Sequence, residues 1–378
     1  MSYEKIDRRA LRTWPLAERT SELQIEKIAL DPDSPAPALR PPAGAPGGGL
    51  DPQLRALTDR VVAARHRGAS VMLVYGAHLI KNGAGPLVNR LIERGWVTHV
   101  GTHGAGVIHD WEFAFAGESS ESVRNYAPCG RFGSWEETGR NINLVAIAAA
   151  AEGIGFGEGI GRFIAEDGLT LPVPEALAEQ IASDPAGPLA GGRADLLRAM
   201  QTFDVASGRY EVAHPFKRFS VPAACYSHGV PFTVHPGIGY DIFANHSMFH
   251  AAAVGRASGT DADIFTHSIL NLDGGVYISI GSAIMSPQVF EKAFSAANNL
   301  RQQTGRDFLQ DHYIAVVDIQ EAHDWDWTQG EPPKEHPAYY LRFCKTFHRM
   351  GGTVDYLCGD NRVVLANLVS LLRDQSPE

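Results

Sequence analysis

Short apolar runs alternate with amphipathic stretches along most of the chain, a pattern typical of an α/β protein with a parallel sheet. Residues 69–76 (ASVMLVYG) are almost wholly apolar, as expected for a strand buried on both faces. Residues 51–68 and 85–95, on either side, repeat apolar side chains at helical spacing. Residues 97–104 predict the next strand, so strand, helix and strand make a βαβ unit.

The alternation continues towards the C-terminus. We expect further strands at residues 221–227, 231–235, 263–270, 274–281 and 312–319, and helices at residues 142–153, 287–303, 337–350 and 363–374. Residues 167–200 predict two or three polar helices, which we interpret as a helical insertion near 165–215. Glycine occupies every second position of residues 153–161, which favours a flexible loop. The predicted fold class is an α/β protein whose parallel sheet is flanked by helices.

The N-terminal segment has a different composition. Residues 31–50 are rich in proline, alanine and glycine, as in a linker or an extended surface segment. We therefore predict an N-terminal arm and linker over residues 1–50 and a single α/β domain over residues 51–378. Such an arm packs on a partner subunit or is disordered, and the sequence leaves both open.

Composition narrows the class of partner. The chain carries a net charge of −10, which argues against binding to a phosphate backbone. Its longest uncharged aliphatic run, residues 144–151, is too short to span a membrane, and the charged N-terminus predicts no secretory signal. Four scattered cysteines form no disulfide framework. We expect a cytoplasmic protein without nucleic-acid or membrane partners.

Two of the loops predicted at the carboxyl ends of strands, where open parallel sheets bind ligands, are rich in glycine and histidine. In residues 76–85, the Asn82-Gly83 turn and the helix that follows suit a phosphate, although a plain β–α turn is the alternative. This loop does not match Gly-x-Gly-x-x-Gly or the Walker pattern. In residues 101–113, three glycines allow close approach of a ligand, and His103, His109 and Asp110 supply titratable groups.

Histidine is densest in residues 228–250. His246 and His250 would share a helix face if this segment were helical. Together with Asp241 or His235 they would then offer ligands to a metal. The sequence lacks a glutamate directly after His246, so this is not a His-Glu-x-x-His site.

Residues 324–327, in the C-terminal third of the chain, are acidic and aromatic. Asp324 and Asp326 alternate with Trp325 and Trp327. Carboxylates and aromatic rings together suit a cationic amine, and a surface loop is the alternative.

Lys345 is one of only seven lysines, against twenty-six arginines. It lies between Phe343 and Phe347 on a predicted apolar helix face. Burial would lower its pKa and make it a nucleophile, whereas a lysine that reaches to solvent is the common alternative.

These segments resemble deoxyhypusine synthase. Residues 70–110 are similar to the family's strand, Asn-Leu-Ile-x-x-Gly loop, helix and second strand ending in Thr-x-Gly-Gly and an acidic residue. Residues 220–242 resemble its Ile-Pro-Val-Phe-Cys-Pro segment with the following Asp-Gly-Ser-x-Gly-Asp. The spacing from Pro337 to Lys345 matches that from the proline to the nucleophilic lysine in Arg-Pro-Asp-Glu-Ala-x-x-Trp-Gly-Lys, with Phe343 at the tryptophan position. The resemblance covers roughly residues 65–345, and the polar insertion aligns poorly.

The resemblance implies a Rossmann-like sheet that binds NAD at its strand ends, in a homotetramer with sites between subunits. The implied reaction is oxidation of an amine or polyamine to an imine, with aminoalkyl transfer through a lysine. The implied catalytic residues are Lys345, His235, Asp241 and His103, and the substrate-binding residues are Asp324, Asp326, Trp327 and Phe343. The implied cofactor-binding residues are Gly76, His78, Asn82, Gly83, Thr102, Gly104, Ala105, Gly106, Asp110, Gly281, Ser282 and Asp318.

The chain departs from the family at three places. Ser286-Pro287 replaces a histidine pair, Asp318-Ile319 replaces Asn-Thr, and His235-Pro236-Gly237 replaces Thr-Asp-Gly. These positions contact the polyamine or the nicotinamide in the family, so a different substrate is expected. The loop after the second strand is also similar to the NAD-binding domain of bacterial ornithine-cyclising enzymes.

Three hypotheses follow. The first is an NAD-dependent enzyme acting on an amine. The second is a metal-dependent hydrolase that uses His235, His246 and His250. The third is a non-catalytic homologue that binds a nucleotide.

Overall fold

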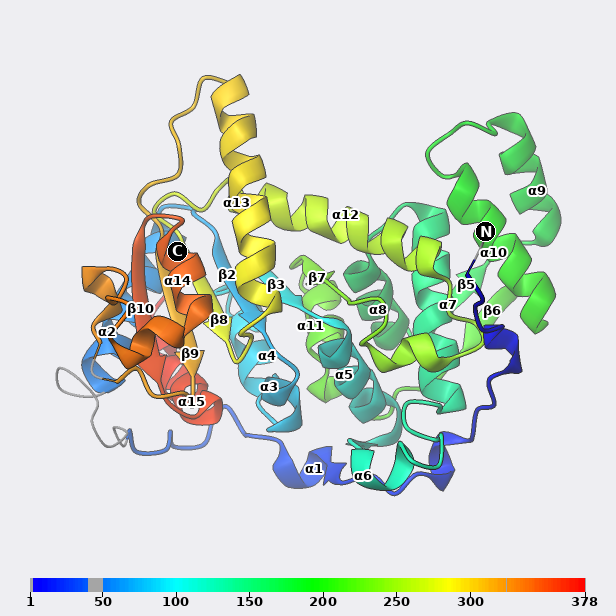
Figure 1. Cartoon of the computed structure of the whole chain (residues 1–378), viewed down its shortest axis with the longest axis horizontal. Coiled ribbons are helices and arrows are strands. Elements are labelled where there is room, and N and C mark those ends of the chain that lie inside the picture. The colour runs from blue at the N-terminus through cyan, green and yellow to red at the C-terminus, as the bar shows by residue number, and fades with distance from the viewer. Residues whose placement is uncertain (1–2, 40–49, 324, 378) are drawn as a thin grey trace.

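A six-stranded, all-parallel sheet lies at the centre of the computed structural model, which describes residues 3–39, 50–323 and 325–377 (Figure 1). The strands are β2 (Val71–Tyr75), β3 (His99–Thr102), β7 (Phe232–Val234), β8 (Val276–Ile280), β9 (Tyr313–Asp318) and β10 (Thr353–Cys358). The predicted fold class is confirmed.

The order of the strands is β10-β9-β8-β2-β3-β7. The chain therefore starts at β2, moves outward through β3 to β7, and returns to the other side of β2 to add β8, β9 and β10. This is the doubly wound order 3-2-1-4-5-6. The direction of winding reverses between β2 and β8. Doubly wound sheets bind ligands at this position, and we refer to the carboxyl ends of these two strands as the crevice.

Helices cover both faces of the sheet. On one face, α2 (Leu50–His66), α4 (Gly85–Glu93) and α15 (Asn361–Leu372) pack around Leu73, and α5 (Gly104–Ala116) contributes to the same core. On the other, α12 (Ala251–Ile269), α13 (Met285–Gln303) and α14 (Arg342–His348) pack around Val74. Successive residues of β2 thus enter different cores, which is why the strand is apolar throughout.

A helical region joins β3 to β7 and lies beside the sheet in Figure 1. After α5 it contains α6 (Val123–Tyr126), α7 (Glu136–Glu152), α8 (Phe156–Ala165), α9 (Pro174–Ser183), α10 (Ala190–Phe203) and α11 (Val221–Ser227). The predicted insertion near 165–215 holds α9, α10 and the antiparallel pair β5 (Gly168–Leu171) and β6 (Gly208–Glu211).

The glycine-rich segment 153–161 was predicted as a loop, and this was wrong because most of it lies in α8. The glycines serve close packing instead. A Cβ at Gly157 would lie 1.8 Å from the carbonyl oxygen of Phe232, and one at Gly161 would lie 2.6 Å from that of Pro222. Helix α8 therefore approaches the backbones of β7 and α11 directly.

Two predicted strands are also helical. Residues 221–227 form α11, which begins where the Ser220 hydroxyl accepts the N–H of Ala223. Residues 263–270 lie largely in the C-terminal part of α12. The predicted helix 337–350 is divided into η7 (Pro337–Tyr340) and α14, and strand β10 was not predicted.

The N-terminal arm runs along the surface of its own chain (Figure 1). Its strand β1 (Leu23–Gln24) pairs with β4 (Glu118–Ser119), and Ile25 of α1 (Ile25–Ile28) enters the main core. Further along, the carbonyl oxygens of Pro32 and Pro37 accept hydrogen bonds from α15 and the residue after it. Linker residues 40–49 lie outside the described residues.

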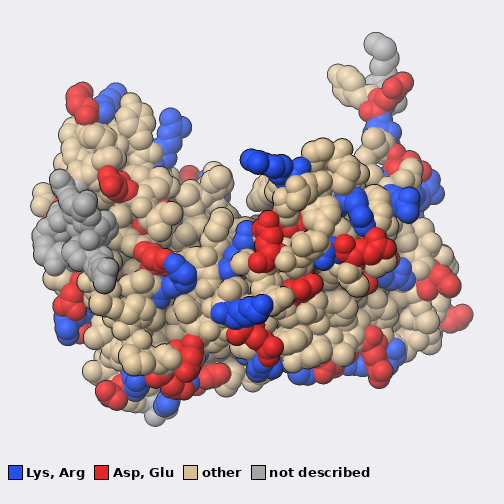
Figure 2. Space-filling view, turned by 90° about the horizontal axis from the view of Figure 1, so that it is seen from below, with Lys and Arg blue, Asp and Glu red and all other residues tan. Residues whose placement is uncertain are grey.

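In the described part of the chain, no single helix combines the length and the hydropathy of a membrane span; α7 and α8 meet those criteria only as a pair bent by 118°. Figure 2 shows acidic and basic side chains interspersed over one face of the molecule.

Candidate functional site

The crevice begins where β2 and β8 end side by side. The N–H of Gly76, directly after β2, donates to the carbonyl oxygen of Ile280 at 2.9 Å. A Cβ at Gly76 would lie 2.1 Å from the carbonyl oxygen of Gly281, so no side chain fits there. Gly281 has φ +58°, in the left-handed region that favours glycine. The hydroxyl of Ser282 accepts the N–H of Ser286 at 3.2 Å in the same loop.

The first turn of α5 faces this edge, and a carboxylate of the protein fills it. Asp241 accepts hydrogen bonds from the N–H groups of Gly104, Ala105 and Gly237. A Cβ at Gly104 would lie 2.3 Å from Oδ2 of Asp241, so glycine permits this approach. Burial raises the pKa of Asp241 from 3.8 to about 6, and the three N–H donors oppose that shift. The start of α5 is therefore an anion site.

His103 links the loops after β2 and β3. Its Nδ1 lies 3.2 Å from the backbone nitrogen of Ala105, and its Nε2 lies 3.4 Å from that of Ala77. A neutral imidazole has one acceptor nitrogen, so the shorter contact is the better hydrogen bond. Burial, with a smaller contribution from His78, lowers the pKa of His103. The His78 side chain is exposed beside it.

Thr102 and Gly106 shape the same turn. The Thr102 hydroxyl donates to the carbonyl oxygen of Tyr75 at 2.9 Å, and a Cβ at Gly106 would lie 2.2 Å from that hydroxyl. Helix α5 can therefore start directly at the end of β3.

His235 follows β7 on the neighbouring side of the edge. Its backbone N–H donates to the carbonyl oxygen of Thr102 at 2.8 Å. Its Nε2 lies 3.1 Å from the hydroxyl of Thr233, and burial lowers its pKa to about 4. The fold thus brings three of the four predicted catalytic residues, His103, His235 and Asp241, to adjoining strand ends.

Three predicted cofactor-binding residues lie elsewhere. The Asn82 amide donates to Asn361 of α15. A Cβ at Gly83 would lie 2.0 Å from the carbonyl oxygen of Ile28, so the arm covers this turn. Asp110 accepts from the Ser220 hydroxyl at 2.5 Å and from the N–H of Val221, and burial raises its pKa to about 7. Their roles as cofactor-binding residues stay predictions.

Asp318 ends β9, two strands away from β2, and its carboxylate accepts the N–H of Gln320. Lys345 lies on α14, which packs on α13 and β10 towards that side of the sheet. It is buried, and its Nζ lies 3.3 Å from the centroid of the Tyr339 ring. Lys345 and the predicted cofactor loops after β2 and β3 are thus associated with different strands.

The predicted amine pocket is largely absent from the described residues. Asp326 caps its own turn through Thr328 and Gln329. Trp327 and Phe343 are buried in the core around Val74. Asp324 lies outside the described residues.

The described residues do not form the histidine metal site of the alternative hypothesis. His246 directly follows the short 3₁₀ helix η5 (Ile242–Asn245), and α12 begins only after His250, so the two histidines do not share a helix face. His246 contacts Glu136 at 3.1 Å, and His250 pairs with Asp195 at 3.4 Å. No cluster of three or more His, Cys, Asp or Glu side chains that could hold a metal occurs in residues 3–39, 50–323 and 325–377.

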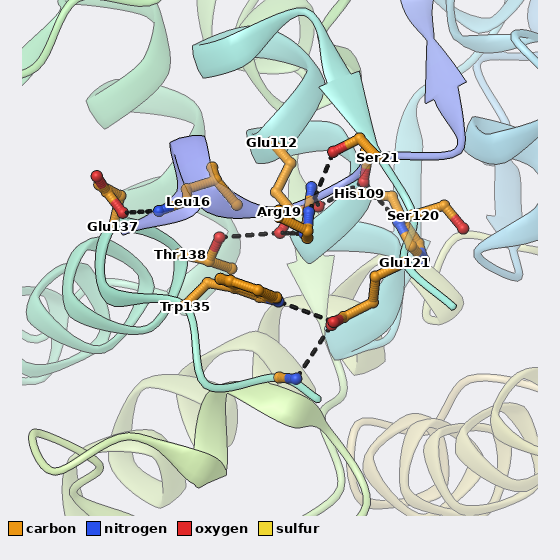
Figure 3. A network of polar contacts seen from close by, with 12 residues as sticks. Leu16, Arg19, Ser21, His109, Glu112, Ser120, Glu121, Trp135, Glu137 and Thr138 are labelled. Carbon is orange, nitrogen blue, oxygen red and sulfur yellow. Dashed lines mark hydrogen bonds and ion pairs between the residues drawn. The ribbon is translucent and has the colours of Figure 1, made fainter. Parts of the chain in front are cut away.

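A buried ion pair behind the site was not predicted (Figure 3). Arg19 of the arm forms two hydrogen bonds with Glu112 of α5, at 2.7 and 2.9 Å, and both side chains are 1% exposed. The hydroxyls of Ser119 and Thr138 donate to the same carboxylate. The arm therefore holds the helix whose first turn forms the anion site. Only distant parts of the sequence supply these groups, so no local motif marks them.

Two cavities lie away from the crevice. One of about 440 Å³ is lined by residues of α8, α11 and α12 and by residues 229–232, and includes Cys225 and Phe232. The other, about 520 Å³, lies among α7, α9 and α10. Among the described residues, none of those predicted for the site lines either cavity.

No family model matches the chain, and no curated protein matches it in sequence. Among solved structures it is similar to a conserved putative LOR/SDH protein from Methanococcus maripaludis S2, with 12% identity, a TM-score of 0.43, and coverage of 90% of this chain and 73% of that one. It is also similar to apo ArgZ, an arginine dihydrolase from the ornithine–ammonia cycle in cyanobacteria, with 12% identity, a TM-score of 0.43 and 86% of this chain covered.

A third similar structure is the ternary complex of AgrE with ornithine and NAD⁺, with 12% identity, a TM-score of 0.40 and 86% of this chain covered. The match covers 33% of ArgZ and 33% of AgrE. Because all three TM-scores lie below 0.5, the fold assignment rests on the strand order of the chain itself. Membership in the deoxyhypusine synthase family stays a prediction.

Proposed function

We propose that the chain is an NAD-dependent enzyme that oxidises an amine at the crevice between β2 and β8. The observation that carries the proposal is the winding order 3-2-1-4-5-6 with Gly76 and Gly281 at its point of reversal. Dinucleotides bind at this position of doubly wound sheets. The cofactor would lie against the protein backbone at Gly76, Gly104 and Gly281. The N–H groups at the start of α5 would then face its phosphates.

NAD, when bound, would accept a hydride from the carbon that carries the amine. The chain's own task is then to remove the proton of the substrate ammonium, since a protonated amine cannot become an imine. His235 and Asp241 adjoin the crevice and have pKa values shifted by burial to about 4 and about 6. A carboxylate with a pKa close to neutrality suits a general base.

Calorimetric titration of the assembled protein with NAD tests the cofactor. We expect Gly104→Ala, whose Cβ would enter the anion site, to weaken NAD binding at least about tenfold, a loss of about 1.4 kcal/mol. Gly255→Ala is the matched control, because Gly255 lies on α12 with open space at its Cβ position. No heat with millimolar NAD, or equal affinity of the two variants, would overturn the proposal. Binding without turnover of any amine would favour a non-catalytic nucleotide-binding protein.

Aminoalkyl transfer through Lys345 is a separate part of the proposal. Lys345 is buried and its Nζ lies 3.3 Å from the centroid of the Tyr339 ring, and an aldehyde that reached it would form an imine with it by losing water. Borohydride trapping with NAD and a diamine, read by peptide mass spectrometry, tests this. Label on another lysine, or full turnover by Lys345→Ala, would remove Lys345 from the mechanism.

We further propose a homo-oligomer, with a tetramer as the predicted state. Large apolar side chains are exposed in the loops after β7, β8 and β9: Ile238 (61%), Tyr240 (68%), Ile284 (74%) and Ile319 (78%). A second copy covering them would complete the rim of the site. A monomer in sedimentation at micromolar concentration would contradict this.

A further inference from the structure

A chain of four hydrogen-bonding side chains runs beside the sheet from the crevice to the opposite edge. Nε2 of His235 lies 3.1 Å from the hydroxyl of Thr233, which lies 3.0 Å from Nε2 of His99. Nδ1 of His99 lies 2.9 Å from the hydroxyl of Ser268. His99 begins β3, so this end lies at the amino edge of the sheet, where Ser268 is partly exposed.

The contacts are sheltered and fixed. His99 and Thr233 are fully buried. Both imidazole rings meet Phe265 edge to face, with centroids 5.2 and 5.1 Å away. A Cβ at Gly101 would lie 3.4 Å from the Thr233 hydroxyl oxygen, so the glycine keeps the space beside that hydroxyl open. Water is thereby kept from the middle of the chain.

Each group in the chain can donate and accept one hydrogen bond. Burial lowers the pKa of His99 to about 3 and that of His235 to about 4, so both rings are neutral near pH 7. A neutral imidazole carries its proton on one nitrogen and accepts at the other, and a hydroxyl does both. All three hydrogen bonds can therefore be donated in the direction of His235 or in the direction of Ser268, and none is lost when the direction reverses.

We propose that Thr233, His99 and Ser268 are positioning residues that form a proton relay from His235 to the amino edge of the sheet. A proton taken up at Nδ1 of His235 releases its Nε2 proton to Thr233, and the Thr233 proton passes to Nε2 of His99. The Nδ1 proton of His99 then passes to Ser268, whose own proton leaves to water. One proton enters, one leaves, and no residue keeps a charge. The source of the proton rests on the proposed amine oxidation, whereas the relay itself does not.

The test is the tautomer of His235, read from ring ¹⁵N resonances of the full chain labelled at histidine, at pH 7. His235 and His99 are assigned by His235→Gln and His99→Gln. We expect Ser268→Ala to shift the His235 resonances across the relay. The shift should vanish in a Thr233→Val background and return with Thr233→Ser, which a merely structural role of Thr233 would not require.

Two results would overturn the relay. One is that Ser268→Ala shifts the resonances of His99 but leaves those of His235 unchanged, which needs only the single variant. The other is an equal shift with Thr233→Val. Neither depends on NAD, so a failed NAD titration would reject the proposed function and leave the relay to be judged on these spectra.

Discussion

Gly76 and Gly281 meet backbone to backbone at the point where the sheet reverses its winding, with only 2.1 Å between a Cβ built on Gly76 and the carbonyl oxygen of Gly281. The two residues follow adjacent parallel strands, β2 and β8, that are separated by about 200 residues of chain. This contact sets how closely the two loops at the floor of the crevice approach each other.

Gly76→Ala should lower the free energy of unfolding by roughly 3 kcal/mol, because backbone must move to admit the methyl group. Gly281→Ala is the matched comparison. Its Cβ has open space, and only its left-handed φ of +58° opposes the substitution, at a cost of about 1 kcal/mol. Urea unfolding of both variants checks the order. Equal losses would show that the contact at Gly76 relaxes freely.

Asp241→Asn should strengthen NAD binding about tenfold, or about 1.4 kcal/mol, and reduce amine turnover. The charge that repels a phosphate is removed, and a neutral amide holds the N–H groups of α5 less strongly than a carboxylate does, so a phosphate can displace it. In the wild type, protonation of Asp241 as the pH falls through about 6 has the same effect on affinity, and the variant loses this pH dependence.

Calorimetric titration with NAD between pH 5 and 8 measures the change in affinity and its pH dependence. Asp326→Asn is the control, because that carboxylate only caps its own exposed turn. Weaker NAD binding by Asp241→Asn would mean that the carboxylate supports the cofactor and does not compete with it.

Asp261→Asn should change how stability depends on pH. Burial raises the pKa of Asp261 from 3.8 to about 8, while its Oδ2 accepts the N–H groups of Gly157 and Val234 at 2.9 Å. The folded state then binds a proton that the unfolded state releases, so wild-type stability falls as pH rises from about 4 to about 8. The contribution is at most about 1.4 kcal/mol per pH unit.

The Asn variant lacks this loss and should therefore gain stability relative to the wild type between pH 5 and 8, measured by urea unfolding. Asp263→Asn changes an exposed position of the same helix, so its free energy of unfolding should depend on pH in the same way as that of the wild type. Parallel curves for Asp261→Asn as well would mean that Asp261 is ionised in the folded protein.

Arg19→Met should cost about 3–5 kcal/mol of stability, because it leaves the Glu112 carboxylate buried without its cation. The double variant Arg19→Met with Glu112→Gln should lose less than Arg19→Met alone, since no unpaired charge remains. Arg55→Met breaks an exposed pair with Asp51 and should leave the free energy of unfolding almost unchanged. Urea unfolding checks all three, and an additive double variant would contradict the coupling.

The sequence predicted the parts of the fold that local pattern determines. Residues 69–76 were recognisable as a strand because both faces of β2 are buried. The strand predictions for residues 221–227 and 263–270 were wrong because short apolar segments look alike in helices and strands. The burial of Cys225 and Phe265 against tertiary partners decided the outcome. The loop predicted at the glycines of α8 was wrong for a related reason, since only the close contact with Phe232 explains why glycine is needed there.

The candidate site divides in the same way. His103 directly follows β3 and His235 directly follows β7, so the sequence could predict that both lie at strand ends. His99 and Thr233 lie inside strands and gain their partners only when β3 and β7 pair. The contacts of Asn82, Gly83 and Asp110 could not be predicted, because their partners are distant in sequence and lie at the start of α15, in the arm and at the start of α11.

The contacts between the arm and α15 also impose an order on biosynthesis. Pro37 is held by Asn367, 330 residues downstream, and Pro32 by Arg373, 341 residues downstream. A ribosome must therefore translate almost the whole α/β domain before these two anchors of the arm exist. Until then this part of the arm has no final partner and is accessible to proteases and chaperones. It can dock onto α15 only after β9, β10 and α15 have been synthesised.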